Sequence, residues 1–228
     1  MQGSTRCADV NGRWSSPESR WCGFLVCAAP SRHPCGPGDR RSRFAVSTSI
    51  VDPRLDGRPV RRIVYSAEQI AERVRELGRD ITRTYPDGDL LVLGLLKGSF
   101  IFLSDLVRSV TRPLQVDFLV AASYGDQMAS SGNVRLVYDP ETELEGKHIL
   151  LVEDIVDSGR TLSRLMDLLS VRSPRSLDIC ALLHKHVDTH LRYPVKMVGF
   201  DAPNEFLVGY GLDHAENFRH LPYIASLQ

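Results

Sequence analysis

Short runs rich in apolar residues alternate with helical patterns along most of the chain. The segments at 90–96 (LLVLGLL), 148–152 (HILLV) and 176–183 (SLDICALL) lack the regular polar alternation of a strand that has one face in water. Such runs are typical of strands buried on both faces, as in a parallel sheet between helices. We therefore expect an α/β domain with a central, mostly parallel sheet flanked by helices.

Helices are expected between these runs. Ser66 and Gln69 form the pattern of a capping box, and apolar residues from Ile70 to Ile81 then recur at helical spacing. Two further helices are expected at 100–110 and 162–169. The remaining strands are expected at 114–123, 134–138, 196–203 and 206–211.

The first 58 residues differ in composition from the rest. They are rich in Arg, Ser, Pro and Gly and poor in acids, which is typical of unfolded chain. Four of the five cysteines lie here, at spacings that match no paired zinc-ligand pattern. We expect 1–58 to be an N-terminal extension, dispensable or organelle-targeting, and 59–228 to be the folded domain. The expected location is the cytoplasm, or an organelle if the extension is a transit peptide.

The charge balance of the chain argues against two classes of partner. Lys and Arg number 28, as do Asp and Glu, so the formal net charge is zero. A neutral chain has no electrostatic preference for nucleic acid or for an anionic membrane. No apolar run approaches the roughly 20 residues that a membrane-spanning helix needs. We therefore expect neither a nucleic-acid nor a membrane partner.

The stretch ILLVEDIVDSGRT, at 149–161, places acids where a buried strand ends. Glu153 and Asp154 follow the apolar run directly, and Asp157 comes just before a small, donor-rich turn at 158–161. Ligands of open α/β sheets bind beyond the carboxyl ends of the strands. Backbone N–H groups and hydroxyls at a helix start suit a phosphate, and Gly159 lets the backbone approach it closely. The alternative is a solvated acidic turn with a helix cap.

Carboxylates beside a phosphate repel it unless they serve other atoms. Those atoms can be ribose hydroxyls, Mg²⁺ or a proton in transit. The stretch at 149–161 therefore indicates a sugar-phosphate ligand, with the turn holding phosphate and Glu153 and Asp154 holding hydroxyls.

The segment LLVEDIVDSGRTL resembles the signature of the type I phosphoribosyltransferases, which bind 5-phosphoribosyl-1-pyrophosphate. Its form, with E-D, two apolar residues and then D-S-G, is most similar to the hypoxanthine-guanine branch. The resemblance extends from about Ile63 to Leu227. It implies the type I phosphoribosyltransferase fold, with a core at about 63–185 and a small hood subdomain to which about 186–228 contribute.

The resemblance implies a role for each part of this motif. Asp157 is the candidate general base at purine N7, relaying the proton shed as N9 is alkylated. Glu153 and Asp154 would address the ribose and, with Asp213, Mg²⁺ as the cofactor. The 5′-phosphate would be held by Ser158, Gly159, Arg160 and Thr161.

Two other segments resemble parts of the donor site in this family. GLLKGSF, at 94–100, is similar to the pyrophosphate-binding loop, formed by Leu96, Lys97 and Gly98. The family implies a cis peptide between Leu96 and Lys97 in some states, and a pyrophosphate contact from Arg219. SYGDQMASSGNV resembles the flexible catalytic loop, which Ser123 and Tyr124 mark and whose closure would exclude water.

The expected purine site comes from the end of the chain. Lys185 matches a lysine that hydrogen-bonds the 6-oxo group, which favours hypoxanthine and guanine over adenine because an ammonium only donates. Phe206 matches the aromatic residue that stacks on the base, and Leu207 an aliphatic residue whose main chain meets its exocyclic edge. Asp213 matches a carboxylate that reaches Mg²⁺ through water.

The activity implied is purine salvage: transfer of 5-phosphoribosyl to hypoxanthine or guanine, giving IMP or GMP and pyrophosphate. Relatives in the family form dimers or tetramers, so a homo-oligomer is expected. Two alternatives remain open at this point. Some proteins of this fold are RNA-binding regulators, which should show a basic face, and a transferase could prefer xanthine or adenine, although adenine conflicts with Lys185.

Overall fold

The computed structural model describes residues 52–55, 57–124, 133–185 and 191–227. These residues belong to one compact unit, Ser47–Gln228. No described helix is long and apolar enough to cross a membrane. The expected extension lies almost wholly outside the described residues, together with four cysteines, so its targeting role stays a prediction.

Six strands form the main sheet, in the order β4–β3–β2–β5–β6–β7. Neighbouring strands run parallel, except β3 and β4, which are antiparallel. The mostly parallel sheet expected from the apolar runs is therefore confirmed. The strands are β2 Leu90–Leu95, β3 Gln115–Tyr124, β4 Asn133–Tyr138, β5 His148–Val156, β6 Ser176–Lys185 and β7 Val195–Ala202.

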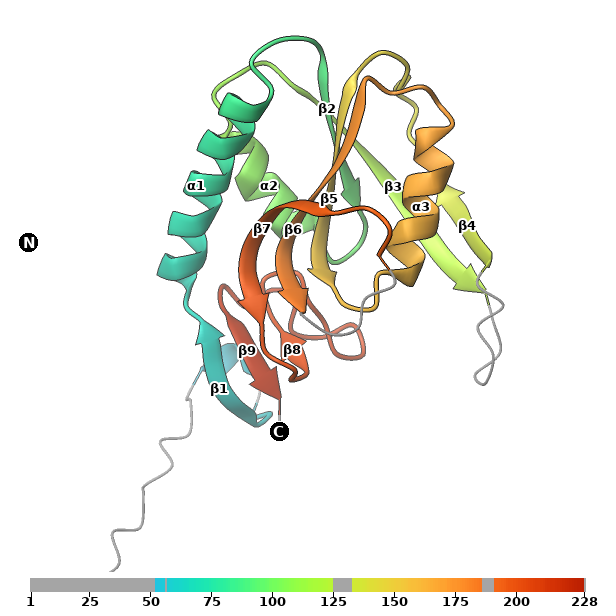
Figure 1. Cartoon of the computed structure of the whole chain (residues 1–228). Helices are drawn as coiled ribbons and strands as arrows, with labels where there is room; N and C mark the ends of the chain where they lie inside the picture. The colour runs from blue at the N-terminus through green and yellow to red at the C-terminus, as the bar shows by residue number, and fades with distance from the viewer. Residues whose placement is uncertain (1–51, 56, 125–132, 186–190, 228) are drawn as a thin grey trace, which may run out of the picture. The chain divides into compact units, whose positions relative to one another are not determined.

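Helices cover both faces of this sheet (Figure 1). Helices α1 (Ala67–Thr84) and α2 (Phe100–Ser109) pack with one set of strand residues, and α3 (Arg160–Ser170) packs with the other. Because both faces are buried, β5 is fully apolar from Ile149 to Val152, with each side chain 0 % exposed. The expected two-sided burial is thus confirmed.

The start of α1 is the predicted capping box. The Ser66 hydroxyl accepts a hydrogen bond from the backbone N–H of Gln69, and the Gln69 side chain accepts one from the backbone N–H of Ser66. The four apolar residues at helical spacing are buried against the sheet: Ile70, Val74, Leu77 and Ile81. Local sequence and long-range packing therefore favour the same helix.

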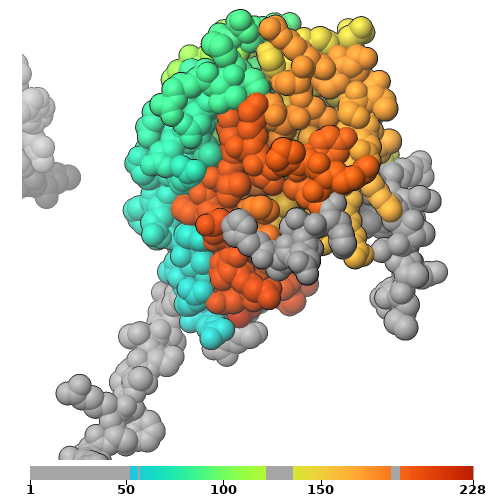
Figure 2. Space-filling view, in the orientation of Figure 1, coloured from blue at the N-terminus to red at the C-terminus, as the bar shows by residue number. Residues whose placement is uncertain are grey.

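A second, three-stranded sheet forms the hood, in the order β1–β9–β8. It joins β1 (Val60–Tyr65) to β8 (Leu207–Val208) and β9 (Ile224–Leu227), so both ends of the folded chain build it. Figure 2 shows the cyan N-terminal residues against the orange-red C-terminal ones. The resemblance implied that about 186–228 contribute to the hood. In the structure β1 also belongs to the hood sheet, and β7 belongs to the main sheet.

The folded part of the chain begins before residue 59. The short 3₁₀ helix Pro53–Leu55 places Leu55 in the apolar cluster of the hood, where it is 2 % exposed. Asp52 accepts a hydrogen bond from the Tyr223 hydroxyl at 2.8 Å. Residues just before the expected boundary therefore pack with the domain, because their one large apolar side chain fills the hood core.

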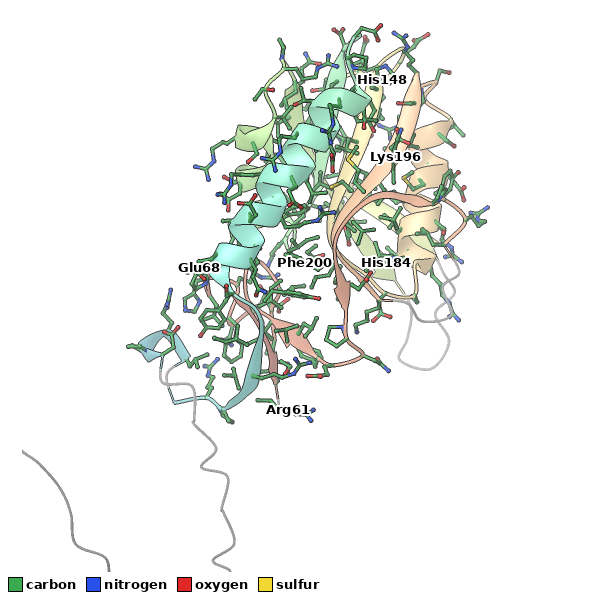
Figure 3. The ribbon with its side chains drawn as sticks, turned by 60° about the vertical axis from the view of Figure 1, so that its left-hand side comes forward. Arg61, Glu68, His148, His184, Lys196 and Phe200 are labelled. Carbon is green, nitrogen blue, oxygen red and sulfur yellow. The ribbon has the colours of Figure 1, made fainter. Side chains whose placement is uncertain are left out.

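The hood is fixed against the carboxyl-terminal end of β7. The rings of Tyr65 and Phe200 stack with centroids 4.2 Å apart, and the Tyr65 hydroxyl donates to the backbone oxygen of Asp201. Figure 3 shows His148 at one end of the sheet and His184, near the end of β6, toward the other. The hood thus stands at the edge where the parallel strands end.

Candidate active site

Strand β5 carries the acidic motif and is longer than expected. It continues through Val156, because its ladder with β6 runs from His148 to Val156. The expectation that the strand ends before Glu153 is therefore wrong. Glu153 and Asp154 are residues of the paired strand, near its carboxyl end. Of the three acids, only Asp157 lies beyond the strand. The turn is correspondingly short, since α3 begins at Arg160.

The two adjacent carboxylates lie in different surroundings. Glu153 lines a pocket on the α3 side of the strand. Asp154 lies against the loop after β2, where a Cβ on Gly98 would come within 1.6 Å of its Oδ2 atom. Successive side chains of a strand point to opposite faces, which explains the separation. Sequence neighbours in the motif can therefore contact different parts of one ligand.

The pocket after β5 has a volume of about 150 Å³. It has room for about five water molecules, which is enough for a phosphate group. Every residue from Glu153 to Leu162 except Asp154 lines it: Glu153, Ile155, Val156, Asp157, Ser158, Gly159, Arg160, Thr161 and Leu162. The structure thus brings all the residues expected to hold the 5′-phosphate around one cavity at the start of α3.

Gly159 is required at the mouth of this pocket for two reasons. Its φ angle is +69°, a left-handed backbone conformation that residues other than glycine rarely adopt. A Cβ at this position would also lie 2.6 Å from the Cβ of Leu191. The N-terminus of α3 is therefore open to a ligand on one side and packed against Leu191 on the other.

Glu153 is the most electrostatically unusual residue of the site. Its Oε2 atom is buried, and no group of the described residues donates a hydrogen bond to it. Burial, with a smaller effect of Asp154, raises the pKa of Glu153 well above its ordinary value. An orphaned buried carboxylate costs stability unless a donor or a cation completes it. A ribose hydroxyl or a divalent cation would supply the partner that the described residues do not.

Asp154 belongs to a second charged group, on the α2 side of β5. Burial raises its pKa, while the nearby charge of Arg219 lowers it and that of Asp213 raises it. The Arg219 guanidinium pairs with Asp213 at 2.8 Å. No three His, Cys, Asp or Glu side chains among the described residues form a ready metal cluster. Glu153, Asp154 and Asp213 therefore do not surround an ion by themselves.

The loop between β2 and α2 contains a cis peptide between Leu96 and Lys97, as the resemblance implied. The loop packs against the segment after β8, where a Cβ on Gly211 would come within 2.1 Å of the Gly98 backbone oxygen. Arg219 donates to the Gly211 backbone oxygen at 2.8 Å. Gly211 therefore brings together the two segments expected to bind pyrophosphate, Lys97–Gly98 and Arg219.

The expected purine residues gather at the ends of β5, β6 and β7. The Lys185 ammonium lies 3.1 Å from Oδ2 of Asp157, and its side chain is 15 % exposed. Phe206 is 55 % exposed and meets His214 edge to face, with ring centroids 5.3 Å apart. Leu207 is buried in β8. A donor, an acceptor and an uncovered aromatic ring thus stand at one edge of the sheet.

One expected element is only partly described, and one residue was missed. Ser123 and Tyr124 end β3 and pair with β4, but 125–132, most of the expected catalytic loop, lie outside the described residues. Sequence reasoning missed Glu216, whose carboxylate contacts both Lys97 and Arg219. No local signal marks it, because the contact with Lys97 joins positions 119 residues apart.

Comparisons with known proteins show which family the folded part of the chain resembles. Residues 62–215 match the family model described as the phosphoribosyl transferase domain. A hypoxanthine-guanine phosphoribosyltransferase of Dictyostelium discoideum is 49% identical over 172 residues, which are 74% of this chain and 96% of that protein. The hypoxanthine phosphoribosyltransferase of Escherichia coli is 47% identical over 161 residues, which are 70% of this chain and 90% of that protein.

A crystal structure is similar as well. A hypoxanthine-guanine phosphoribosyltransferase of Bacillus anthracis, with a HEPES molecule in its active site, superposes with a TM-score of 0.71 at 40% identity. The match covers 74% of this chain and 99% of that one. With a family match over most of its folded residues, and relatives nearly half identical over almost their full length, the chain belongs to the phosphoribosyltransferase family.

Proposed function

We propose that the protein transfers the 5-phosphoribosyl group of 5-phosphoribosyl-1-pyrophosphate to N9 of hypoxanthine or guanine. The products are IMP or GMP and pyrophosphate. The pairing of Lys185 with Asp157 at 3.1 Å carries this proposal. It places a group that only donates beside a group that only accepts, at the sheet edge where the sugar-phosphate pocket lies.

This pair matches one edge of a 6-oxopurine. O6 and N7 are neighbours on that edge, so Lys185 can donate to O6 while Asp157 holds the proton at N7. Adenine would present its 6-amino hydrogens to the ammonium, and a buried donor would then lose its partner. Phe206, which is 55 % exposed, would stack on the base, and the main chain of Leu207 would meet its exocyclic edge.

The donor would span the two sides of β5. The 150 Å³ pocket around Ser158–Thr161 would hold its 5′-phosphate, and Glu153 and Asp154 its ribose hydroxyls. Lys97, Gly98 and Arg219 would hold its pyrophosphate on the α2 side. Held in this way, C1 of the ribose would lie between the leaving pyrophosphate oxygen and N9 of the purine, as in-line transfer requires.

We propose Mg²⁺ as the cofactor, held mainly by oxygens of the donor. Mg²⁺ usually keeps one or two carboxylates beside phosphate oxygens and water, which fits a site where the described residues form no cluster of three metal-binding side chains. Glu153, Asp154 and Asp213 are the carboxylates that would contribute. The ion would offset the negative charge that develops on the leaving pyrophosphate.

We also propose that the protein is a homo-oligomer, a dimer or tetramer. Large apolar side chains are exposed on the α2 side of β3 and at the start of α2. They include Val116 at 41%, Phe118 at 37% and Phe100 at 45% exposure. Val116 and Phe118 share one face of β3, where their β2 partners are Val92 and Gly94. Clustered exposed apolar side chains favour burial against another protein surface.

The substrate assignment is tested by pyrophosphate release with the donor, Mg²⁺ and each of four purines. Hypoxanthine or guanine should release pyrophosphate, because Lys185 and Asp157 match their O6 and N7. Adenine should release none above background. The rate of release with xanthine shows whether the contacts near Leu207 accept this base as well. Silence with all four bases would contradict the enzyme assignment.

Replacing Lys185 by Ala should raise KM for hypoxanthine by roughly tenfold to a hundredfold, because a charged hydrogen bond to O6 is lost. KM for the donor should change much less, and steady-state kinetics separate the two. Lys147→Ala is the matched control, since Lys147 precedes β5 at the opposite end of the sheet. An unchanged KM for hypoxanthine in Lys185→Ala would remove the proposed O6 contact.

Replacing Asp157 by Asn should lower kcat by roughly 10²- to 10⁴-fold, because a neutral amide cannot accept the purine proton. Donor affinity, measured by calorimetry, should survive, since the phosphate pocket keeps its shape. Asp87→Asn removes an equal charge from a side chain that is 76% exposed, far along the chain from the motif. Near wild-type turnover in Asp157→Asn would exclude Asp157 as the base.

The oligomeric state is tested by light scattering after gel filtration. The mass should be two or four times 25.5 kDa. Val116→Asp should shift the population toward monomer, because a carboxylate would be buried without a partner. Val171→Asp is the control, at an apolar side chain that is 80% exposed on the other side of the sheet, just after α3. A monomeric wild type would refute this proposal.

A further inference from the structure

The carboxylate of Glu216 lies between Arg219 and Lys97 of the loop after β2. The surrounding turn is closed by a bridge between His214 and Asn217. Glu216 itself has a φ of +62°, and its backbone N–H donates to Asp213 at 2.9 Å. These contacts hold the backbone of the turn, so the side chain starts from a defined position beside the expected pyrophosphate site.

Both oxygens of this carboxylate face cations of that site. Oε1 lies 3.2 Å from the Lys97 ammonium, and Oε2 lies 3.5 Å from the Arg219 guanidinium. The two cations come from segments far apart in the sequence, which the close packing of Gly211 on Gly98 brings together. One anionic group thus bridges the two side chains that a pyrophosphate would need.

We propose that Glu216 occupies the anion position of the pyrophosphate site in the unliganded protein, and competes with pyrophosphate for Lys97 and Arg219. This inference rests on the proposed function. When pyrophosphate binds, the carboxylate must give up both cations, and its charge then repels the ligand. When pyrophosphate leaves, the carboxylate takes its place. Glu216 therefore weakens the affinity for the product and favours its release.

The exposure of the contact supports competition over a structural role. The Lys97 and Glu216 side chains are 68% and 67% exposed. Ion pairs this exposed contribute little to folding stability. A unit charge a few ångströms from a multiply charged ligand still changes its binding, because each ligand charge interacts with it. We expect an effect of roughly threefold to tenfold on pyrophosphate affinity.

Asp213 contacts the same guanidinium but differs from Glu216 in its surroundings. It pairs with Arg219 at 2.8 Å and lies close enough to Asp154 to raise the pKa of that carboxyl. Asp213 therefore belongs with the carboxylates proposed to reach Mg²⁺. Glu216 is the acid that also contacts Lys97, so its replacement separates competition from metal binding.

The test compares wild type with Glu216→Gln, which keeps the size of the side chain and removes its charge. Binding of inorganic pyrophosphate in Mg²⁺ buffer is measured by calorimetry, and its inhibition constant against the donor by steady-state kinetics. Glu145→Gln is the matched control, because it removes the same charge from an exposed loop that precedes β5, at the end of the sheet away from the site.

Glu216→Gln should bind pyrophosphate three to ten times more tightly, with a lower inhibition constant, while Glu145→Gln binds like wild type. The difference should shrink at high salt, because screening weakens the exposed contact. Equal or weaker binding by a folded Glu216→Gln would overturn the inference. If that variant does not fold, as judged by its thermal melt, Glu216→Ala is subject to the same criterion. A wild type that neither binds pyrophosphate nor transfers phosphoribose would refute the proposed function as well.

Discussion

Strand β5 is hydrogen-bonded to β2 on one edge and to β6 on the other, with both of its faces buried, and this constraint organises the site. The first half of the strand must be apolar because helices pack on both sides of it. Where the helices stop covering the sheet, the ladder with β6 continues to Val156. Glu153 and Asp154 are therefore held on a rigid strand, yet at the edge where a ligand can reach them.

The position of Glu153 and Asp154 on this strand has an electrostatic cost. Burial raises the pKa of both carboxyl groups, and no group of the described residues donates to the buried Oε2 atom of Glu153. A folded protein retains such a group against its own stability only where the surroundings hold it in place. The charges of Arg219 and Asp213 act on Asp154, whereas Glu153 lines the pocket at the start of α3. Glu153 and Asp154, neighbours in the chain, therefore lie in different charged surroundings.

Much of this could be predicted from sequence where the signal is local. The capping box at Ser66, the apolar strands and the segment from Asp157 to Thr161 each lie within a few residues of chain. Sequence alone places the end of β5 too early, because adjacent acids argue against a strand interior, whereas pairing with β6 extends the strand. The role of Leu55 and the contacts of Glu216 depend on tertiary packing between distant positions, so no local pattern reveals them.

The hood joins the two ends of the folded chain, since its middle strand, β9, pairs with β1 on one side and with β8 on the other. Contacts between such distant positions close a long loop, and the entropy of that closure is lost before the contacts form. We expect the hood to be the last part of the domain to fold and a separate unit of local opening. Phe206, which follows β7 and precedes β8, would then become ordered with the hood rather than with the sheet that carries the acids.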